Sequence, residues 1–411
     1  MADLIGFTSI SIVSLITIIL ALKFSSISKV IYIALVVRVL LIIIGHYVIQ
    51  LPDSTQDAVG QEEEAWLIAQ SGFLNLIDHY KGPNPRFHSW LIAFPYSLFG
   101  RSILMAQSIS LLLGIGCVIM AWKLAYKIWD TNIAKKVAWI IALFPSLVLY
   151  SVLVLREVYI CFFLLVALIG VVNWTKTNNF KSIIFALLGF ASASFFHGAM
   201  AVGAMTFILF IGFVSIKRLF ILIKNYKINI KVFISFSFFI LFIFLYVTNK
   251  ISVPYLNDFN FVTNMEVLIE KTKLSTRGIA SYPIWSIANT PTELIYKTPI
   301  RGIFFLFSPL PWEVKEYRHL IGMLDAFIYI YLSYLILRNF KTIWRDPTLK
   351  LILLILISYI AVFAIGVGNF GTAIRHRSKF TIIIILLAAP LIKKLILFTT
   401  RDNINLLRPT K

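Results

Sequence analysis

The segment Leu51–Gly100 reads LPDSTQDAVGQEEEAWLIAQSGFLNLIDHYKGPNPRFHSWLIAFPYSLFG and is the first long polar stretch of the chain. Long apolar runs precede and follow it. It holds six of the eighteen acidic residues, which are Asp53, Asp57, Glu62, Glu63, Glu64 and Asp78. An acidic loop between apolar runs is expected at a membrane surface, where it is a natural place for catalytic groups.

Composition indicates an integral membrane protein. Of the 411 residues, 59% are hydrophobic and 14% are charged, whereas soluble domains have about 25% charged residues. We predict one all-α polytopic membrane domain over residues 1–411, and no basic segment marks the first apolar run as a removable signal peptide. The net charge of +20 is expected to set membrane topology and not to bind nucleic acid. Cys117 and Cys161 lie inside apolar runs, so no disulfide framework is expected.

A membrane-spanning helix needs about 20 mostly apolar residues. This length predicts about eleven transmembrane helices, at 4–22, 30–49, 103–122, 135–152, 157–173, 181–196, 199–216, 231–247, 320–337, 350–367 and 379–397. Two long polar loops remain, at 50–102 and 248–319. The apolar piece 301–312 is short and Pro-rich, which is typical of a re-entrant or interfacial segment.

The distribution of Lys and Arg predicts the orientation. One set of connections carries 22 of the 38 basic residues and only three acids, at 23–29, 123–136, 174–181, 217–231, 338–350 and 393–411. Basic connections stay in the cytoplasm. The N-terminus is therefore expected outside and the C-terminus inside. Both long polar loops, the turn at residues 156–157 and the turn at residues 368–378 are then external.

The first external loop supplies the candidate catalytic acids. Asp57 is expected near the start of an amphipathic helix at the membrane surface, where partial loss of hydration improves a carboxylate as a general base. Asp53 is the reserve candidate. Glu62 belongs to a run of glutamates whose members cannot all share one helix face with Asp57. Farther along, Trp90 and Phe99 are typical of an aromatic belt at the interface.

Charged residues also mark the later external turns. Arg156 and Glu157 are adjacent, so on a helix they point about 100° apart and can contact different groups. Arg375, His376 and Arg377 break the positive-inside pattern, and arginine forks match phosphate oxygens.

Three further arginines are candidate phosphate ligands. Arg277 and Arg301 lie in or beside the second polar loop, where they could close over an anion. Arg38 lies deep in the second predicted span, where a charge costs at least ~2.5 kcal/mol, so it needs a buried partner or a lipid phosphate.

Several short motifs resemble the membrane-embedded glycosyltransferases of the GT-C superfamily, in their bacterial surface-polysaccharide form. They are Asp57-Ala with Glu62 and Ala65, Pro85…Phe99-Gly100, Pro145-Ser…Leu155-Arg156-Glu157, Pro309-Leu-Pro-Trp312 and Asn369-Phe-Gly-Thr-Ala-Ile-Arg-His-Arg377. The resemblance is to dolichyl-phosphate-mannose mannosyltransferase-like and O-antigen polymerase-like proteins. It implies a bacterial inner-membrane location and a sugar donor carried on polyprenyl phosphate or diphosphate, such as undecaprenyl phosphate.

The resemblance also implies residue roles. Asp57 would act as the base on the acceptor hydroxyl, and Glu157 would orient the acceptor or a metal. The leaving phosphate would be stabilised by basic residues, which are Arg156, Arg375, His376 and Arg377, with Arg277 and Arg301 as further candidates. No cofactor is indicated with certainty, although a divalent metal at Asp57, the glutamate run or Glu157 fits the acidic pattern.

Three functions remain open from the sequence. The first is a glycosyltransferase acting on a cell-surface glycan acceptor, as in lipopolysaccharide assembly. The second is an O-antigen or capsule repeat-unit polymerase, which uses lipid-diphosphate-linked oligosaccharides as both donor and acceptor. The third is a lipid-sugar flippase. Transporters of that kind carry internal repeats and charges near the midplane, whereas here the charges other than Arg38 gather at one predicted face.

Overall fold

The computed structural model describes residues 1–82, 84, 86–224, 234, 237, 240–241, 265–276, 278–316 and 319–392. Every regular element in these ranges is a helix, and one isolated antiparallel bridge joins Ser281 to Asn369. The prediction of an all-α protein is therefore confirmed for the described part of the chain. Predicted span 231–247 and candidate Arg277 lie outside the described residues, apart from positions 234, 237, 240 and 241.

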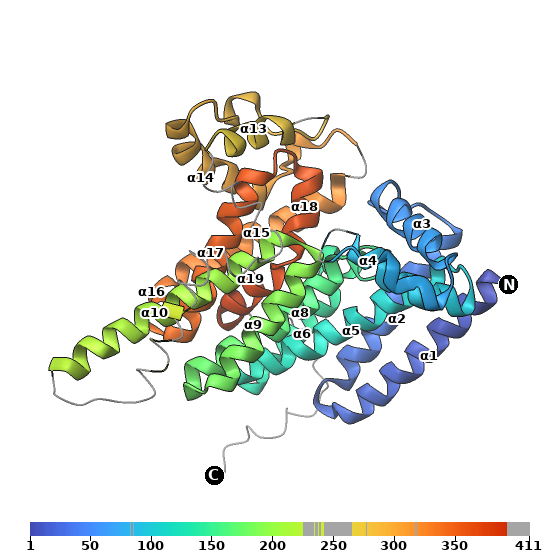
Figure 1. Cartoon of the computed structure of the whole chain (residues 1–411), viewed down its shortest axis with the longest axis horizontal. Helices are drawn as coiled ribbons and strands as arrows, with labels where there is room; N and C mark the ends of the chain where they lie inside the picture. Colours follow the sequence, from blue (N-terminus) through green and yellow to red (C-terminus); the bar gives the residue numbers. More distant parts are fainter. Residues whose placement is uncertain are drawn as a thin grey trace, which may run out of the picture.

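The first half of the chain is a set of long apolar helices interrupted by one polar segment. The apolar helices are α1 (Ala2–Lys23), α2 (Ser28–Tyr47), α5 (Ile103–Ile128), α6 (Thr131–Leu143), the short α7 (Pro145–Tyr150), α8 (Glu157–Thr177), α9 (Phe180–Phe196) and α10 (Ala201–Lys224). The polar segment between α2 and α5 folds as α3 (Asp57–Ala69), η2 (Phe73–His79) and α4 (Phe87–Phe99). Figure 1 shows α1, α2, α5, α6, α8 and α9 running side by side, with α3 and α4 at one end.

The second half packs against this bundle and covers part of the same end. Its helices are α13 (Met265–Ser275), α14 (Pro291–Phe307), α15 (His319–Arg338), α16 (Phe340–Arg345), α17 (Pro347–Gly366), α18 (Phe370–Ser378) and α19 (Thr381–Ala388). In Figure 1, α13, α18 and α3 all lie toward the upper side of the view. The segment 301–312 forms the end of α14 and the short helix η6 (Pro311–Glu313).

Within the described residues, six helical segments are long and apolar enough to cross a membrane. They are Ala2–Lys23, Ser25–Tyr47, Ile103–Ile128, Glu157–Thr177, Gly198–Leu219 and Pro347–Gly366, and two shorter apolar helices cover Phe180–Phe196 and Thr381–Leu391. These lengths are those of a multi-pass α-helical membrane protein, although they do not establish the predicted eleven spans. Predicted span 135–152 is split between α6 and α7, because Pro145 lacks the N–H that would continue the helix.

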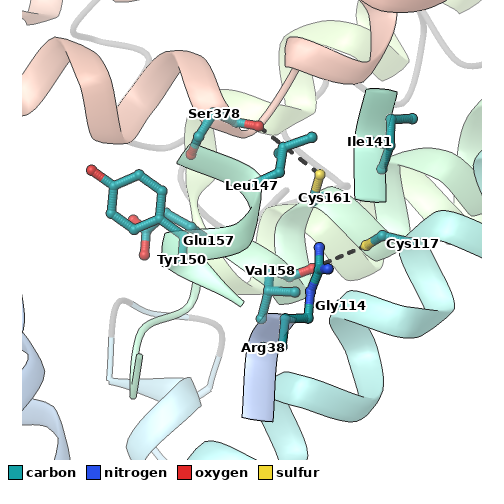
Figure 2. A pocket seen from close by; sticks show the side chains of 10 residues that line it. All are labelled: Arg38, Gly114, Cys117, Ile141, Leu147, Tyr150, Glu157, Val158, Cys161 and Ser378. Carbon is teal, nitrogen blue, oxygen red and sulfur yellow. Dashed lines mark hydrogen bonds between the residues drawn. The ribbon is translucent and has the colours of Figure 1, made fainter. Parts of the chain in front are cut away.

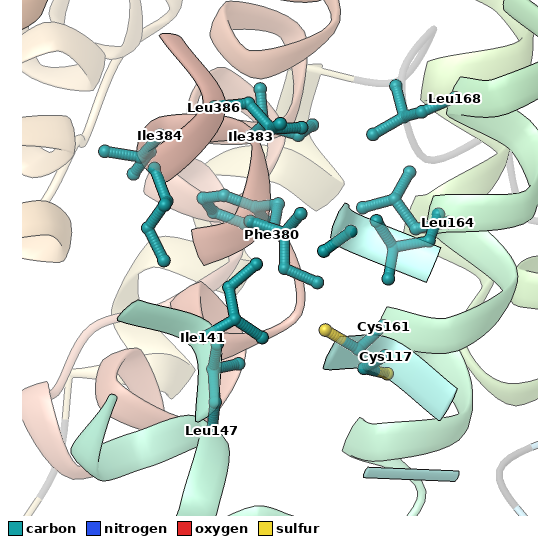
Figure 3. Packing of buried hydrophobic residues seen from close by; sticks show 14 of the residues in the cluster. Cys117, Ile141, Leu147, Cys161, Leu164, Leu168, Phe380, Ile383, Ile384 and Leu386 are labelled. Carbon is teal, nitrogen blue, oxygen red and sulfur yellow. The ribbon is translucent and has the colours of Figure 1, made fainter. Parts of the chain in front are cut away.

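The closest helix pairing in the bundle depends on small residues. A Cβ at Gly170 of α8 would lie 2.5 Å from the backbone nitrogen of Ala186, and one at Gly189 of α9 would lie 2.5 Å from that of Ala167. The two helices therefore touch backbone to backbone, as small residues allow in membrane bundles. Nearby, Phe380 packs at the centre of a buried apolar cluster that joins the two halves of the chain (Figure 3).

Candidate functional site

Three charged residues from distant parts of the chain meet at one end of the bundle. Arg375 of α18 donates from Nε to Oε1 of Glu157 at 2.7 Å, and from Nη1 to Oδ2 of Asp57. We call Asp57, Glu157 and Arg375 the carboxylate cluster. Residues that the sequence marks separately, in the first polar segment and in two later turns, therefore form one site.

Helix ends place each charge of the carboxylate cluster. Asp57 begins α3 and Glu157 begins α8, whereas Arg375 lies in the last turn of α18. Helix N-termini carry a partial positive charge and C-termini a partial negative charge, so each residue lies where its helix stabilises it. The polar turns between apolar helices thus aim opposite charges at one point.

Burial differs sharply across the cluster. The Glu157 side chain is 1% exposed, Arg375 is 13% exposed and Asp57 is 68% exposed. Burial by itself would lower the pKa of Arg375, but the carboxylates of Glu157 and Asp57 outweigh it and raise that pKa above its usual range. The site therefore has a fixed, buried anion at its base and an accessible carboxylate at its mouth.

Asp53 lies beside this cluster. Its Oδ2 accepts a hydrogen bond of 2.7 Å from the hydroxyl of Tyr150 at the end of α7. Asp53 adopts a left-handed φ of 59°, a conformation that aspartate tolerates better than most residues. Loss of hydration around the carboxylate raises the pKa of Asp53, and the hydrogen bond from Tyr150 acts in the opposite direction. The residue as a whole is exposed.

Further cations and imidazoles surround Glu157. The Lys379 Nζ lies 3.8 Å from Glu157 Oε1 and contacts His376 Nδ1. The ring of His197 lies 5.1 Å from that of His376. Burial, and then the positive charge of Lys379, lower the pKa of both histidines well below the usual range. Both imidazoles are therefore neutral near pH 7.

Arg156 and Arg38 approach the same region from two sides. Arg156 is the N-cap residue of α8 and directly precedes Glu157. Arg38 donates to Ser151 Oγ at 2.8 Å and to the Ala142 carbonyl at 2.9 Å. Figure 2 shows the small cavity that Arg38 lines together with Glu157. The buried partner expected for Arg38 is thus a hydroxyl and backbone carbonyls.

Arg377 points away from the carboxylate cluster. Its Nη1 donates to the carbonyl oxygens of Leu306 at 2.9 Å and Ser308 at 2.7 Å, and Nη2 donates to Gly322 at 3.2 Å. We call this set the carbonyl cage. The guanidinium also lies 4.7 Å from the ring centre of Tyr329. In this arrangement Arg377 ties α14 and α15 to α18 and is not turned toward the site.

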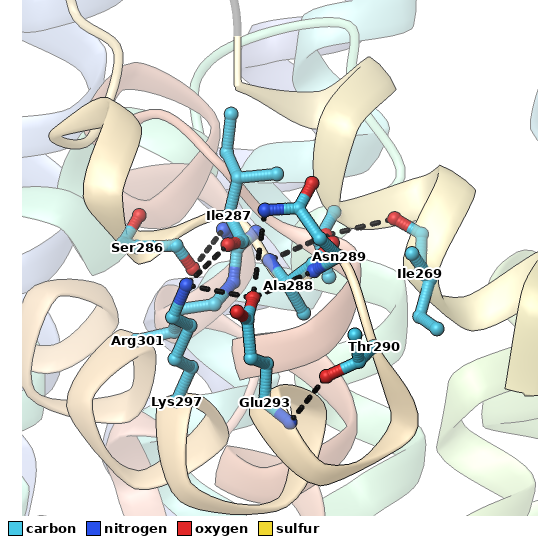
Figure 4. Close-up of polar contacts among 10 residues, drawn as sticks. Ile269, Ser286, Ile287, Ala288, Asn289, Thr290, Glu293, Lys297 and Arg301 are labelled. Carbon is cyan, nitrogen blue, oxygen red and sulfur yellow. Dashed lines mark hydrogen bonds and ion pairs between the residues drawn. The ribbon is translucent and has the colours of Figure 1, made fainter.

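Arg301 of α14 is held in a similar way. Its Nε donates to the Ala364 carbonyl at 2.9 Å, and Nη2 donates to Val367 at 2.8 Å. Figure 4 shows Arg301 near Ser286 and near Lys297, which lies one turn earlier on α14 and bonds Glu293 at 2.9 Å. These hydrogen bonds connect α14 to the end of α17, and the side chain of Arg301 is fully buried.

Glu62 is also bound elsewhere. Its carboxylate accepts from Arg101 Nη2 at 2.6 Å and from the Tyr96 hydroxyl at 2.8 Å. These contacts join α3 to α4 and to the start of α5. Tyr96 is accordingly a buried partner of Glu62.

The sequence assigned no role to Tyr150, and it counted Lys379 with the basic cluster at Arg375–Arg377 without naming it as a site residue. Tyr150 binds Asp53, and Lys379 lies against Glu157 and His376. Lys379 follows a basic triplet, whereas Tyr150 lies inside an apolar run that continues to Leu155, so the sequence gives it no distinguishing signal. Within the described ranges, no group of three His, Cys, Asp or Glu side chains is arranged to hold a metal ion.

Comparison of this chain with protein-family models, curated proteins and solved structures finds no match. The function of the protein is therefore inferred from the geometry and chemistry of the site itself.

Proposed function

We propose that the protein is a membrane-embedded glycosyltransferase of the GT-C type, located in the bacterial inner membrane. It transfers a sugar from a polyprenyl-phosphate or -diphosphate donor to a cell-surface glycan acceptor on the external face. The observation that supports this most strongly is the carboxylate cluster. It combines an accessible carboxylate with a fixed cation in a chain whose described part holds six potential membrane-spanning helices.

Asp57 is the general base in this proposal. It takes the proton of the acceptor hydroxyl, the acceptor oxygen bonds to the anomeric carbon of the donor sugar, and the bond from that carbon to the phosphate oxygen breaks. The released phosphate keeps the electron pair and gains negative charge. Arg375, with Arg156 and His376 nearby, supplies positive charge and N–H donors where this charge develops.

The ion pair between Asp57 and Arg375 couples donor binding to base activation. A carboxylate held by a guanidinium is a weak base, because the bond favours its charged form. A donor phosphate offers Arg375 a stronger, two-pronged partner than the exposed Asp57 carboxylate does. Donor binding then releases Asp57 for the acceptor hydroxyl, while the buried Glu157 keeps Arg375 and Lys379 in position.

The proposed sidedness follows from the basic residues. The connections with most of the Lys and Arg are cytoplasmic, which puts the N-terminus and the carboxylate cluster outside and the C-terminus inside. The site then faces lipid-linked donors in the outer leaflet.

The test is Asp57→Asn in a strain that lacks the protein, with surface polysaccharide analysed on a gel and the membrane level of the variant measured by blot. We expect a normal level of protein and the polysaccharide pattern of the deletion strain. The matched control is Asp78→Asn, which removes another exposed acid of the same polar segment and should restore the wild-type pattern. Wild-type polysaccharide from Asp57→Asn would contradict the proposed base.

The same gels distinguish a transferase from a polymerase. A deletion strain that keeps a full ladder with shifted mobility lacks a decorating transferase. A deletion strain that shows only one repeat unit lacks a repeat-unit polymerase, in which case the acceptor is itself lipid-linked.

A further inference from the structure

A second hollow lies on the same polar segment as Asp57. It has a volume of about 60 Å³ and is formed where α3, η2 and α4 meet. Its principal lining residues are Glu64, His79, Tyr80, Arg86, Phe87 and Trp90. We call it the aromatic hollow. None of these residues belongs to the carboxylate cluster or to the carbonyl cage.

The three aromatic rings of the hollow hold one another in place. Phe87 and Trp90 are stacked, with ring centres 5.7 Å apart, and Tyr80 lies 5.0 Å from Trp90. The Trp90 Nε1 donates to the Leu76 carbonyl at 2.8 Å, which fixes the orientation of the indole. The hollow therefore presents rigid aromatic surface, and 42% of Tyr80 remains exposed.

Polar groups stand at the edge of these rings. Arg86 Nε lies 3.3 Å from Glu64 Oε1, so the hollow offers a donor and an acceptor side by side with no net charge from this pair. Asn84 braces the rim, because its side chain donates to the Gly82 carbonyl at 3.1 Å and accepts from the Arg86 backbone N–H at 2.7 Å. Lys81 also lines the hollow and gives it one net positive charge, whereas the carboxylate of Glu64 favours a hydrogen-bonding neutral ligand over a phosphate.

This combination matches the chemistry of a sugar ring. One face of a pyranose carries C–H groups that pack on an aromatic ring, and its hydroxyls both donate and accept hydrogen bonds. Small-molecule sites typically pair apolar and aromatic surface with a few such polar groups. Aromatic residues that only anchor a helix at the membrane interface do not require an ion pair such as Arg86–Glu64 at the edge of their rings.

We propose that the aromatic hollow binds a sugar ring of the acceptor glycan, away from the ring that reacts. This inference rests on the proposed transferase function, since it names a subsite for that reaction. Glu64 follows Asp57 by seven residues on the same helix, which corresponds to about 10 Å of rise. A glycan chain held in the hollow can thus extend along α3 toward Asp57.

The experiment is calorimetric titration of the full chain in detergent. The probe is the glycan released by mild acid from envelopes of cells that lack the protein. Removing one aromatic face with Tyr80→Ala should raise Kd about three- to tenfold, and Tyr80→Phe, which keeps the ring, should restore binding. Glu64→Gln should weaken binding in the same direction. The matched control is Phe99→Ala, an exposed aromatic of α4 outside the hollow, which should bind as wild type.

Several results would overturn the proposal. Unchanged Kd for both Tyr80→Ala and Glu64→Gln would do so, as would an equal loss with Phe99→Ala, which indicates a general interface effect. Absence of glycan binding by the wild-type chain would also refute it. Inorganic phosphate that competes with the glycan would assign the hollow to an anionic headgroup instead.

The outcome is separable from that of the proposed function. Asp78→Asn should bind the glycan with wild-type Kd, because Asp78 is an exposed acid of the same polar segment outside both the hollow and the carboxylate cluster. If glycan binding follows the expected pattern but the deletion strain has normal polysaccharide, the hollow stands and the transferase proposal fails. If polysaccharide depends on Asp57 but the Kd for the glycan is unchanged by Tyr80→Ala and Glu64→Gln, the transferase proposal stands and sugar binding in the aromatic hollow is refuted.

Discussion

Arg375 and Arg377 lie two residues apart on α18, and their guanidinium groups have different kinds of partner. Arg375 binds two carboxylates at the open end of the bundle, whereas Arg377 binds neutral carbonyl oxygens in the interior. Both belong to one basic triplet, which the sequence presents as a single phosphate-binding cluster. The structure divides it into an ionic half, the carboxylate cluster, and a neutral half, the carbonyl cage.

The nature of the partners separates an arginine that can exchange its partner for a ligand from an arginine that only stabilises the fold. Asp57 is exposed, so an incoming anion can replace it on Arg375 without uncovering a buried charge. The carbonyls around Arg377 belong to backbone segments of packed helices, and the Arg377 side chain is fully buried among them. Ligand exchange therefore belongs to the carboxylate cluster, and stability belongs to the carbonyl cage.

The largest effect is expected from Arg375→Ala, which breaks the ionic half. It removes the cation that is hydrogen-bonded to the buried Glu157 and leaves Lys379, 3.8 Å away, and the adjacent Arg156 to offset the charge, so we expect a loss of about 3 kcal/mol in unfolding free energy together with loss of polysaccharide. Thermal unfolding in detergent measures the first and complementation the second. Adding Glu157→Gln should recover part of the stability but not the activity, and unchanged stability of the single variant would contradict the cluster.

Arg377→Lys tests the neutral half. Lysine keeps the charge but cannot span the carbonyls of Leu306, Ser308 and Gly322, so we expect a loss of about 1–3 kcal/mol in unfolding free energy. Polysaccharide per folded molecule should stay near the wild-type level. A variant with normal melting temperature whose polysaccharide output depends more steeply on donor supply would instead return Arg377 to phosphate binding.

Lower pH should destabilise the fold through the two histidines that lie beside the carboxylate cluster. The pKa values of His197 and His376 are depressed in the fold, so below about 6.5 the unfolded chain takes up protons that the folded chain does not. Unfolding free energy should then fall by up to about 1.4 kcal/mol per pH unit for each group, until the folded pKa is reached. Melting temperatures from pH 8 to pH 5 measure the slope, which His197→Gln should reduce; a slope unaffected by that change would contradict the assignment.

The smallest effect is expected from Glu62→Gln, a carboxylate that sequence reasoning placed among the catalytic candidates. Its partner Arg101 is 42% exposed and solvent screens the pair, so we expect a loss of about 1 kcal/mol or less. Complementation should be normal, in contrast to Asp57→Asn on the same helix. Loss of polysaccharide by a stable Glu62→Gln variant would move the catalytic assignment along α3.

The sequence predicted the helical membrane class and picked out Asp57, Glu157 and Arg375, because charges at the ends of apolar runs are conspicuous. It did not predict that Arg301 and Arg377 are buried and hydrogen-bonded within the fold. Their partners are backbone carbonyls, which every residue has, so no side-chain pattern marks them. The break between α6 and α7 was also missed, since the apolar run continues through Pro145 while the helix does not. The aromatic hollow depends on how η2 returns to α4, which composition does not encode.

The separation of Glu157 from Arg375 along the chain has a consequence for biosynthesis. Glu157 precedes Arg375 by 218 residues. At a translation rate of roughly 5–20 residues per second, the acid emerges roughly 10–40 seconds before the base that neutralises it. A nascent chain in the membrane thus carries Glu157 at the start of α8 without its hydrogen-bonded partner until α18 arrives. A product truncated before α18 lacks that partner permanently.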